Sequence, residues 1–317
     1  MEKRPLGASG LRISPLVFGG NVFGWTADEA TSFALLDAFL DAGFETIDTA
    51  DGYSVWVPGH DGGESETLIG KWMAARGNRD RVIVATKVGW DVGANGKGLS
   101  RSHIVTAVER SLKRLQTDRI DLYQSHVDDA SVPFEETLEA HAALIKAGKV
   151  RAIGASNTSG ARLKEALAAA DRLGVPRYTS LQPKYNLYDR EPFESDLRDL
   201  CVAENVGVIS FYGLAAGFLT GKYRSKADGG KSPRGARVVE SYVNPRGLRI
   251  VAALDEVAAG IGATPAQVAL AWLLTRPGVT APIVSASTVA QLQEIAKAPS
   301  IRLDRAALDA LEAASAA

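Results

Sequence analysis

The 317-residue sequence is poor in the residues that define several protein classes. Its single cysteine, Cys201, excludes an internal disulfide and any zinc site built from several cysteines. Cys201 lies in an apolar stretch of helical character, where we expect a small buried side chain. Asp128 and Asp129 follow His126 closely, but further histidine or cysteine ligands are missing nearby. We therefore expect no metal site.

Excess charge and long apolar runs are also missing. The formal net charge is −1, so the sequence offers no basic surface for nucleic acid or for an anionic membrane. The apolar runs are far shorter than the roughly 20 residues of a membrane-spanning helix. Residues 1–15, MEKRPLGASGLRISP, contain no apolar core of a signal peptide. We expect a cytoplasmic protein that binds neither nucleic acid nor membrane.

Short β-rich runs alternate with stretches of helical period along the whole chain. We expect strands at residues 16–20, 44–48, 81–87, 119–126, 150–156, 178–182, 207–211 and 281–285. We expect helices at residues 28–42, 63–76, 102–116, 134–147, 159–172, 193–205, 247–260, 265–275 and 304–314. This α/β alternation, over roughly 250 residues or more, predicts a (β/α)8 TIM barrel that occupies residues 1–317 as a single domain.

Two additions to the barrel are expected. The turn-like GASG at residues 7–10 predicts an N-terminal β-hairpin that precedes the first barrel strand and closes the bottom of the barrel. Extra helices are expected at the C-terminal end. A doubly wound sheet is the alternative, but the first strand continues as LVFGGNVFGW, which does not fit the G-x-G-x-x-G of that fold.

Chemically active side chains stand at the ends of three consecutive predicted strands. Asp48 ends one strand and Tyr53 lies in the loop after it, Lys87 ends the next strand, and His126 ends the third. The carboxyl ends of barrel strands meet on one face, which carries the active site. We therefore expect Asp48 to pair with Lys87, and the pair to lie against Tyr53. Paired carboxylates, which a (β/α)8 glycoside hydrolase would need, are missing there.

This set of residues suits proton donation to a carbonyl group. A free tyrosine has a pKa near 10, and a neighbouring ammonium lowers that pKa by favouring the phenolate. We expect Lys87 to lower the pKa of Tyr53 in this way, while Asp48 keeps the buried ammonium paired. His126 can donate a hydrogen bond to the same carbonyl oxygen. None of these side chains can supply a hydride, so a cofactor is needed.

The order D-T-A-x-x-Y, A-T-K and a strand-end histidine resembles the aldo-keto reductase superfamily. FGGNVFGW (18–25), GESETLIGKW (63–72), IGASN (153–157), LQPKYNLYDR (181–190) and GFLTGKY (217–223) are similar to segments of the same family. The resemblance covers nearly the whole chain. It implies an NADPH-dependent reduction of aldehydes and ketones in a TIM barrel, without metal or flavin. Tyr53 would be the general acid, His126 would orient the carbonyl, and Lys87 and Asp48 would tune Tyr53.

The resemblance also implies a set of cofactor-binding residues. Those at the nicotinamide end would be Gly20, Asn21, Asp48, Ser156, Asn157, Gln182 and the stacking ring of Phe211. Those along the pyrophosphate and at the adenosine would be Leu214, Gly217, Lys222, Ser287, Gln291 and Glu294.

Two departures from the family pattern bear on the cofactor. A basic residue often meets the 2′-phosphate of NADPH at the position of Ser287, and an asparagine is common at the position of Ile295. We therefore predict NADPH with NADH as an alternative. Arg224, Arg234 and Arg237 lie in a long basic loop, residues 222–247, and are candidates to supply the missing charge. We interpret this loop as a lid over the cofactor.

Trp25, Trp56 and Trp90 fall in the loops after the first three predicted barrel strands. They predict a largely apolar pocket for aldehydes or ketones of moderate size, with sugars as an alternative. The small carbonyl compound is the expected partner, and the sequence leaves the oligomeric state open. A second hypothesis is a cofactor-binding regulatory or sensor subunit with slow turnover, similar to the potassium-channel β subunits of this superfamily.

Overall fold

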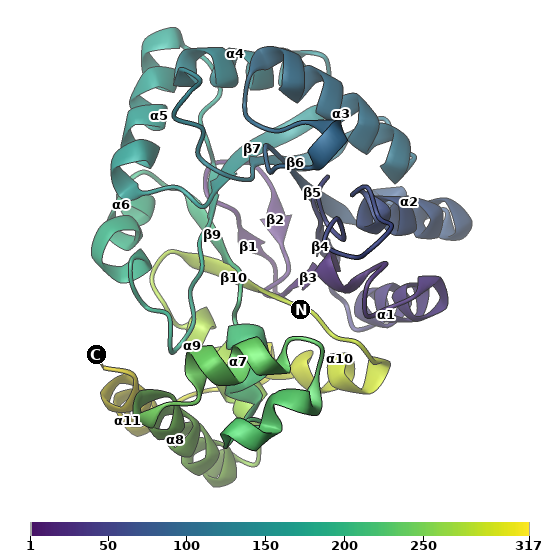
Figure 1. Cartoon of the computed structure of the whole chain (residues 1–317). Coiled ribbons are helices and arrows are strands. Elements are labelled where there is room, and N and C mark those ends of the chain that lie inside the picture. The colour runs from purple at the N-terminus through teal and green to yellow at the C-terminus, as the bar shows by residue number, and fades with distance from the viewer. Residues whose placement is uncertain (1, 317) are drawn as a thin grey trace.

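The computed structural model describes residues 2–316 and shows a closed barrel of parallel strands within a ring of helices (Figure 1). Its strands are β3 (Val17–Gly19), β4 (Thr46–Asp48), β5 (Ile83–Val88), β6 (Ile120–Ser125), β7 (Val150–Ser156), β8 (Ser180–Gln182), β9 (Gly207–Ser210) and β10 (Val279–Val284). Neighbours in sequence are neighbours in the barrel, and β10 pairs with both β9 and β3. The predicted (β/α)8 barrel is confirmed, and the doubly wound alternative is excluded because that sheet stays open.

The N-terminal hairpin consists of β1 (Arg4–Pro5) and β2 (Arg12–Ile13), paired antiparallel. Leu6 and Ile13 are buried in the same apolar cluster as the inward-facing barrel residues. A Cβ on Gly7 would lie 2.3 Å from the carbonyl oxygen of Thr179, just before β8. The hairpin thus closes the end of the barrel at which the strands begin, as predicted, and leaves the carboxyl ends of the strands for the site.

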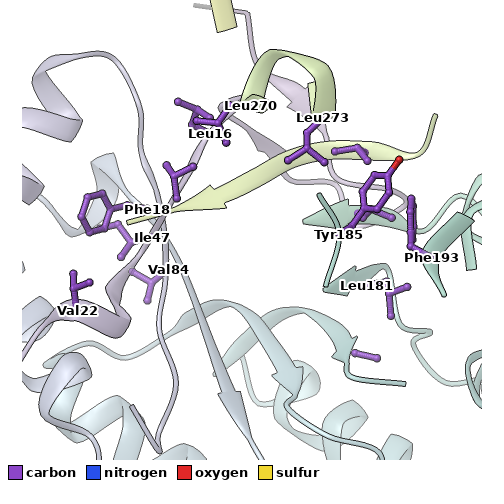
Figure 2. Close-up of a cluster of buried hydrophobic side chains, with 14 of the residues drawn as sticks. Leu16, Phe18, Val22, Ile47, Val84, Leu181, Tyr185, Phe193, Leu270 and Leu273 are labelled. Atoms are coloured by element: carbon purple, nitrogen blue, oxygen red, sulfur yellow. The ribbon is translucent and has the colours of Figure 1, made fainter. Parts of the chain in front are cut away.

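Alternate residues of each strand face opposite sides of the barrel wall. Val17, Ala85 and Leu122 contribute to the interior cluster, whereas the main core lies between the wall and the helices. Figure 2 shows Phe18 and Val84 in this main core, where they pack toward the helical ring. Because apolar positions fill both faces of the wall, the polar side chains at the strand ends stand out as a site.

The helices are α1 (Glu29–Asp41), α2 (Glu64–Arg76), α3 (Arg101–Leu115), α4 (Phe134–Lys146), α5 (Gly160–Leu173), α6 (Arg198–Ala203), α7 (Gly235–Tyr242), α8 (Pro245–Ile261), α9 (Pro265–Leu274), α10 (Val289–Ile295) and α11 (Arg305–Ser315). Local sequence explains the start of α9: Thr264 and Gln267 form a capping box, with Pro265 as the first helical residue. Within residues 2–316, no single helix is long and apolar enough to cross a bilayer. The pair α8 and α9, bent by 94°, passes that test only when taken together, on length and composition alone.

The segment 222–247 is not the long irregular loop that the sequence predicts. It contains a 3-10 helix at Lys226–Lys231, then α7 and the beginning of α8. Tyr242 of α7 stacks on Phe218 at a centroid distance of 5.5 Å, so the segment is packed on the protein. Helix α7 buries Val238, Val239 and Tyr242 at helical spacing, so the sequence does carry its period, although its eight residues span only about two turns. Cys201, on α6, is buried as predicted.

Candidate active site

The barrel brings the predicted catalytic residues to one rim. Asp48 is the last residue of β4, Lys87 lies near the end of β5, and His126 directly follows β6. Tyr53 lies in the connection from β4 to α2, where its N–H donates to the carbonyl oxygen of Ala50. Parallel strands in register deliver these side chains side by side, although they are far apart in the sequence.

The ammonium group of Lys87 hydrogen-bonds to both Asp48 and Tyr53. Its Nζ lies 2.6 Å from Oδ2 of Asp48 and 2.9 Å from the hydroxyl oxygen of Tyr53. It also donates to the carbonyl oxygen of Thr49 at 2.8 Å, so all three of its protons have acceptors. The hydroxyl of Tyr53 lies 3.3 Å from Oδ2 of Asp48. Lys87 and Asp48 are both buried, and this pairing makes that burial tolerable.

The electrostatics of Tyr53 differ from the sequence-based prediction. Burial first, and the charge of Asp48 second, raise the pKa of Tyr53 well above its ordinary value. The expected lowering by Lys87 is wrong for this structure, because Asp48 lies closer to the ammonium than the phenol does and offsets its charge. Tyr53 is therefore protonated at neutral pH. Burial and then Lys87 lower the pKa of His126 well below its ordinary value, so its ring is neutral there.

Aromatic rings lie next to Tyr53 and His126 at the rim. Trp56 meets Trp25 edge-on at a centroid distance of 5.7 Å and meets Tyr53 at 6.1 Å. Trp90 lies 5.2 Å from the ring of His126. Trp56 is 47% exposed and Trp90 is 46% exposed, so each presents a ring face or edge to a bound molecule. The structure thus brings the three predicted tryptophans to the mouth of the barrel.

The residues predicted at the nicotinamide end lie on the same rim. Ser156 ends β7 and donates from its hydroxyl to the carbonyl oxygen of Gln182 at 2.9 Å. Asn157, with a positive φ of 50°, donates to the carbonyl oxygen of His126 at 2.9 Å. Phe211 directly follows β9 and is half-buried, which leaves part of its ring free to stack on a flat group.

Gly20 and Asn21 follow β3. A side chain on Gly20 would collide with the hydroxyl of Ser65 at 2.8 Å, so the backbone there is bare. With the amide of Asn21 oriented so that Oδ1 faces a guanidinium nitrogen of Arg234 at 2.6 Å, Nδ2 donates to the hydroxyl of Ser285 at 2.7 Å. Asn21 is thereby held toward the mouth.

A tight turn after β9 carries the predicted pyrophosphate residues. The N–H of Gly217 donates to the carbonyl oxygen of Leu214 at 2.8 Å, and Gly217 has a φ of 94°, which favours glycine. The ammonium of Lys222 would lie 3.4 Å from a Cβ at Gly217. A bare turn beside an ammonium that forms no ion pair with the described residues fits an anionic diphosphate.

The predicted adenosine residues lie on and before α10. The hydroxyl and the N–H of Ser287 both donate to Oε1 of Gln291 at 3.0 Å. Glu294 accepts from the hydroxyl of Thr264 at 2.8 Å, which ties α10 to the start of α9. These polar groups fit a nucleoside, but they provide no positive charge.

The three candidate arginines do not share a location. Arg224 is paired with Asp255 at 2.6 Å, and Arg237 is exposed. Arg234 lies over the ring of Trp25, 4.6 Å from its centroid, and no acidic side chain among residues 2–316 pairs with it. Arg234 therefore lies beside the residues predicted for the nicotinamide and substrate, rather than beside Ser287.

Residues 15–316 match the sequence profile described as the aldo/keto reductase family. The chain belongs to this family. It is 37% identical over 313 residues to the uncharacterized oxidoreductase YrpG of Bacillus subtilis, covering 96% of this chain and 93% of that protein. It is 36% identical over 300 residues to the aldo-keto reductase YhdN of the same organism, covering 92% and 85%. It is 35% identical over 309 residues to a probable voltage-gated potassium channel subunit beta of Arabidopsis thaliana, covering 94% and 91%.

Membership of the aldo/keto reductase family supports oxidoreduction of carbonyl compounds with a nicotinamide cofactor. In this aldo/keto reductase, two glutamines donate hydrogen bonds to Asp48, and the sequence analysis predicted only one of them, Gln182, as a site residue. Gln182 donates to Oδ1 of Asp48 at 2.9 Å, and Gln124, which sequence reasoning missed, donates to the same oxygen at 3.3 Å. Gln124 lies on β6, two residues before His126, which directly follows that strand, so alternation of side chains could have placed both on the inner face.

Proposed function

We propose that this protein reduces aldehydes and ketones to alcohols with NADPH, reversibly, and that Tyr53 donates the proton. The observation that carries the proposal is the hydroxyl of Tyr53, held 2.9 Å from the ammonium of Lys87 at the rim that it shares with His126. Bound NADPH would supply the hydride. The family match supports carbonyl oxidoreduction in general, and the specific donor and cofactor are the proposal.

The raised pKa of Tyr53 suits a proton donor. A phenol that stays protonated across the neutral range always has a proton to give. When the carbonyl carbon accepts a hydride, its oxygen becomes an alkoxide, which is a much stronger base than a phenolate. The proton then passes from the Tyr53 hydroxyl to that oxygen, and the ammonium of Lys87 stabilises the phenolate that is left behind.

His126 orients the substrate in this proposal. Its ring centroid lies 6.1 Å from that of Tyr53, so one carbonyl oxygen between the two rings could accept a hydrogen bond from each. A neutral imidazole donates a single hydrogen bond and takes no proton from Tyr53. The division of roles is therefore clear: Tyr53 transfers a proton, and His126 holds the oxygen in place.

NADPH is proposed as the cofactor, with NADH as the alternative. Lys222 and Arg234 support a dinucleotide because both are cations without an ion-pair partner among the described residues. Lys222 lies beside the turn at Gly217, and Arg234 lies over the ring of Trp25. The support for the 2′-phosphate is weaker. Ser287 brings no charge, and the guanidinium of Arg224 is already paired with Asp255.

The proposed substrate is an aldehyde or ketone of moderate size with an aromatic or otherwise apolar body. Trp25, Trp56 and Trp90 support this substrate class because they offer apolar surface beside Tyr53 and His126. Sugars stay an alternative, since aromatic faces also bind sugar rings. A small molecule is thus the proposed partner, and the cytoplasmic location stays a prediction from the sequence.

The test is NADPH oxidation with 4-nitrobenzaldehyde, with NADH measured alongside. Tyr53→Phe should lower kcat by about 100-fold or more and leave NADPH binding intact, because only the proton donor is removed. Tyr178→Phe is the matched control, since it removes another buried hydroxyl, one that contacts Ser125 on the outer side of the barrel wall. Tyr53→Phe with wild-type turnover would refute the role of Tyr53.

The second candidate function is a cofactor-binding regulatory subunit with slow turnover. It is favoured by the likeness to proteins named probable voltage-gated potassium channel subunit beta in Arabidopsis thaliana and in rice, at 35% and 37% identity. The same assay separates the two. Tight NADPH binding without turnover on any member of a carbonyl panel would support the regulatory function and contradict the enzyme.

A further inference from the structure

A second group of buried polar side chains lies on the outer side of the barrel wall, behind the turn that carries Tyr53. This outer cluster consists of Asp51, Glu66, Thr86, Arg114 and Tyr123. Glu66, at the start of α2, is fully buried; its Oε2 lies 2.6 Å from Nη2 of Arg114 and its Oε1 accepts from Thr86 at 2.5 Å. The ion pair is thus complete without Asp51.

Asp51 lacks the partners that a buried carboxylate needs. Its side chain is 6% exposed, and no donor within residues 2–316 reaches its Oδ1. Asp51 and Arg114 line the same small cavity, of about 10 Å³, large enough for roughly one water molecule. Asp51 therefore shares this cavity with a guanidinium that is already paired with Glu66, and the cavity has room for about one water molecule.

Every element around Asp51 contributes a charged or titratable group. Glu66 lies near it on α2, Arg114 and Arg110 on α3, Lys87 on β5 and Tyr123 on β6, and Arg110 lines the same cavity as Asp51 and Arg114. Burial first and the negative charge of Glu66 second raise the pKa of Asp51 to about 7, while Arg114, the N–H of Gly52 and Lys87 act in the opposite direction. Asp51 thus changes charge in the neutral range.

The turn from Ala50 to Tyr53 couples this group to the proposed proton donor. The N–H of Asp51 donates to the carbonyl oxygen of Lys87 at 3.2 Å, while the ammonium of Lys87 donates to the hydroxyl of Tyr53. Lys87 is therefore bonded to the turn at both ends, through its backbone to Asp51 and through its side chain to Tyr53. These two hydrogen bonds connect Asp51 to Tyr53 through a single residue.

We propose that Asp51 is a proton-sensitive positioning residue, whose neutral form holds the Tyr53 turn in its active arrangement. This inference rests on the proposed carbonyl reduction. When Asp51 ionises, it repels the carboxylate of Glu66 and adds negative charge on the far side of Lys87. The added negative charge near Lys87 acts against the phenolate that forms when Tyr53 gives up its proton. The rate of carbonyl reduction should therefore fall as the pH rises through about 7.

The first test is the pH profile of kcat/KM for 4-nitrobenzaldehyde reduction, from about pH 5.5 to 8.5. The wild type should lose about threefold or more across this range with a midpoint near 7, and Asp51→Asn should give a flat profile. Tyr53 and His126 do not titrate in this range, because burial shifts their pKa values outside it. Asp309→Asn, at an exposed aspartate of α11 paired with Arg305, is the control and should keep the wild-type profile.

A wild-type profile without this fall, or a fall that persists in Asp51→Asn, would overturn the proposal. Glu66→Gln is the second variant, in case Asp51→Asn does not fold. Removing the charge of Glu66 lowers the pKa of Asp51, so the fall should move to lower pH. An unmoved midpoint in Glu66→Gln would contradict the coupling within the outer cluster.

Thermal unfolding tests the protonation of Asp51 independently of enzyme turnover. The pKa of Asp51 is raised in the folded protein above the roughly 3.9 of an unfolded chain, so the folded state binds more protons between about pH 4 and 7. The protonated carboxyl of Asp51 therefore stabilises the folded protein at low pH, and this stabilisation is lost as the pH rises through that window. The Tm of Asp51→Asn minus that of the wild type should be larger at pH 8 than at pH 5. A pH-independent difference would refute the buried proton, whether or not the protein reduces carbonyl compounds.

Discussion

The ammonium nitrogen of Lys87 lies 2.6 Å from Oδ2 of Asp48, and neither side chain is more than 1% exposed. This pair is the centre on which the proposed chemistry depends, since Lys87 also donates to the hydroxyl of Tyr53. Asp48 in turn accepts from Gln182 and Gln124, so its second oxygen is satisfied as well. The barrel mouth therefore contains a fully hydrogen-bonded buried ion pair beside a protonated phenol.

Removing the ammonium of Lys87 should destabilise the protein, because Asp48 is buried beside it. Lys87→Met leaves the carboxylate of Asp48 buried without a counter-charge, and we expect a loss of about 3–5 kcal/mol in the free energy of unfolding at pH 7. Urea unfolding at pH 7 measures this loss. Lys71→Met, at an exposed pair with Glu29, should cost about 1 kcal/mol or less, and an equal loss in both variants would contradict the expectation.

A positive charge at position 287 should increase the preference for NADPH. Ser287→Arg would place a guanidinium where the hydroxyl now bonds to Gln291, within reach of a 2′-phosphate by the family resemblance. We expect the Kd for NADPH to fall by about 10-fold or more and the Kd for NADH to change little. Quenching of tryptophan fluorescence measures both constants. Ser300→Arg adds the same charge elsewhere, and an equal gain there would indicate a non-specific charge effect.

The exposed tryptophans should set the affinity for aromatic substrates. Trp56→Ala removes a ring that contacts both Trp25 and Tyr53, so the KM for 4-nitrobenzaldehyde should rise by about 10-fold or more. The KM for propanal, which is too small to reach the ring, should stay close to that of the wild type. Val202→Ala, at an exposed apolar residue of α6, is the control. Equal increases for both aldehydes would mean that Trp56 supports the fold of the loop instead.

Much of the architecture could be predicted from local patterns. The strand at residues 150–156 was predicted with the bounds of β7, and Thr264 caps α9 as its sequence indicates. These features depend on residues that are close in the chain, whose periodicity and capping chemistry act over one or two turns. The approach of Asp48 to Lys87 was also predictable, because parallel barrel strands deliver their carboxyl ends to one rim.

The features that the sequence left hidden all depend on distant neighbours. Helix α7 packs Tyr242 on Phe218, and its eight residues, though amphipathic, are too short to be assigned from the sequence without that contact. Gln124 becomes part of the site only because Asp48 and Gln182 come from other strands. In the sequence, Asp51 looks like an ordinary loop aspartate, and only the structure shows that Glu66 and Arg114 lie near it.

The sequence by itself determined the barrel, the identity of the polar residues at its mouth and the absence of disulfides, because composition and period carry that information directly. Only the tertiary structure decided the ionisation of those residues. The pKa of Tyr53 is raised where the sequence predicts lowering, since burial and Asp48 outweigh the nearby ammonium. The physical reason is general: the pKa of a buried group depends on the water it loses and on the charges it meets, and both are set by the packed fold.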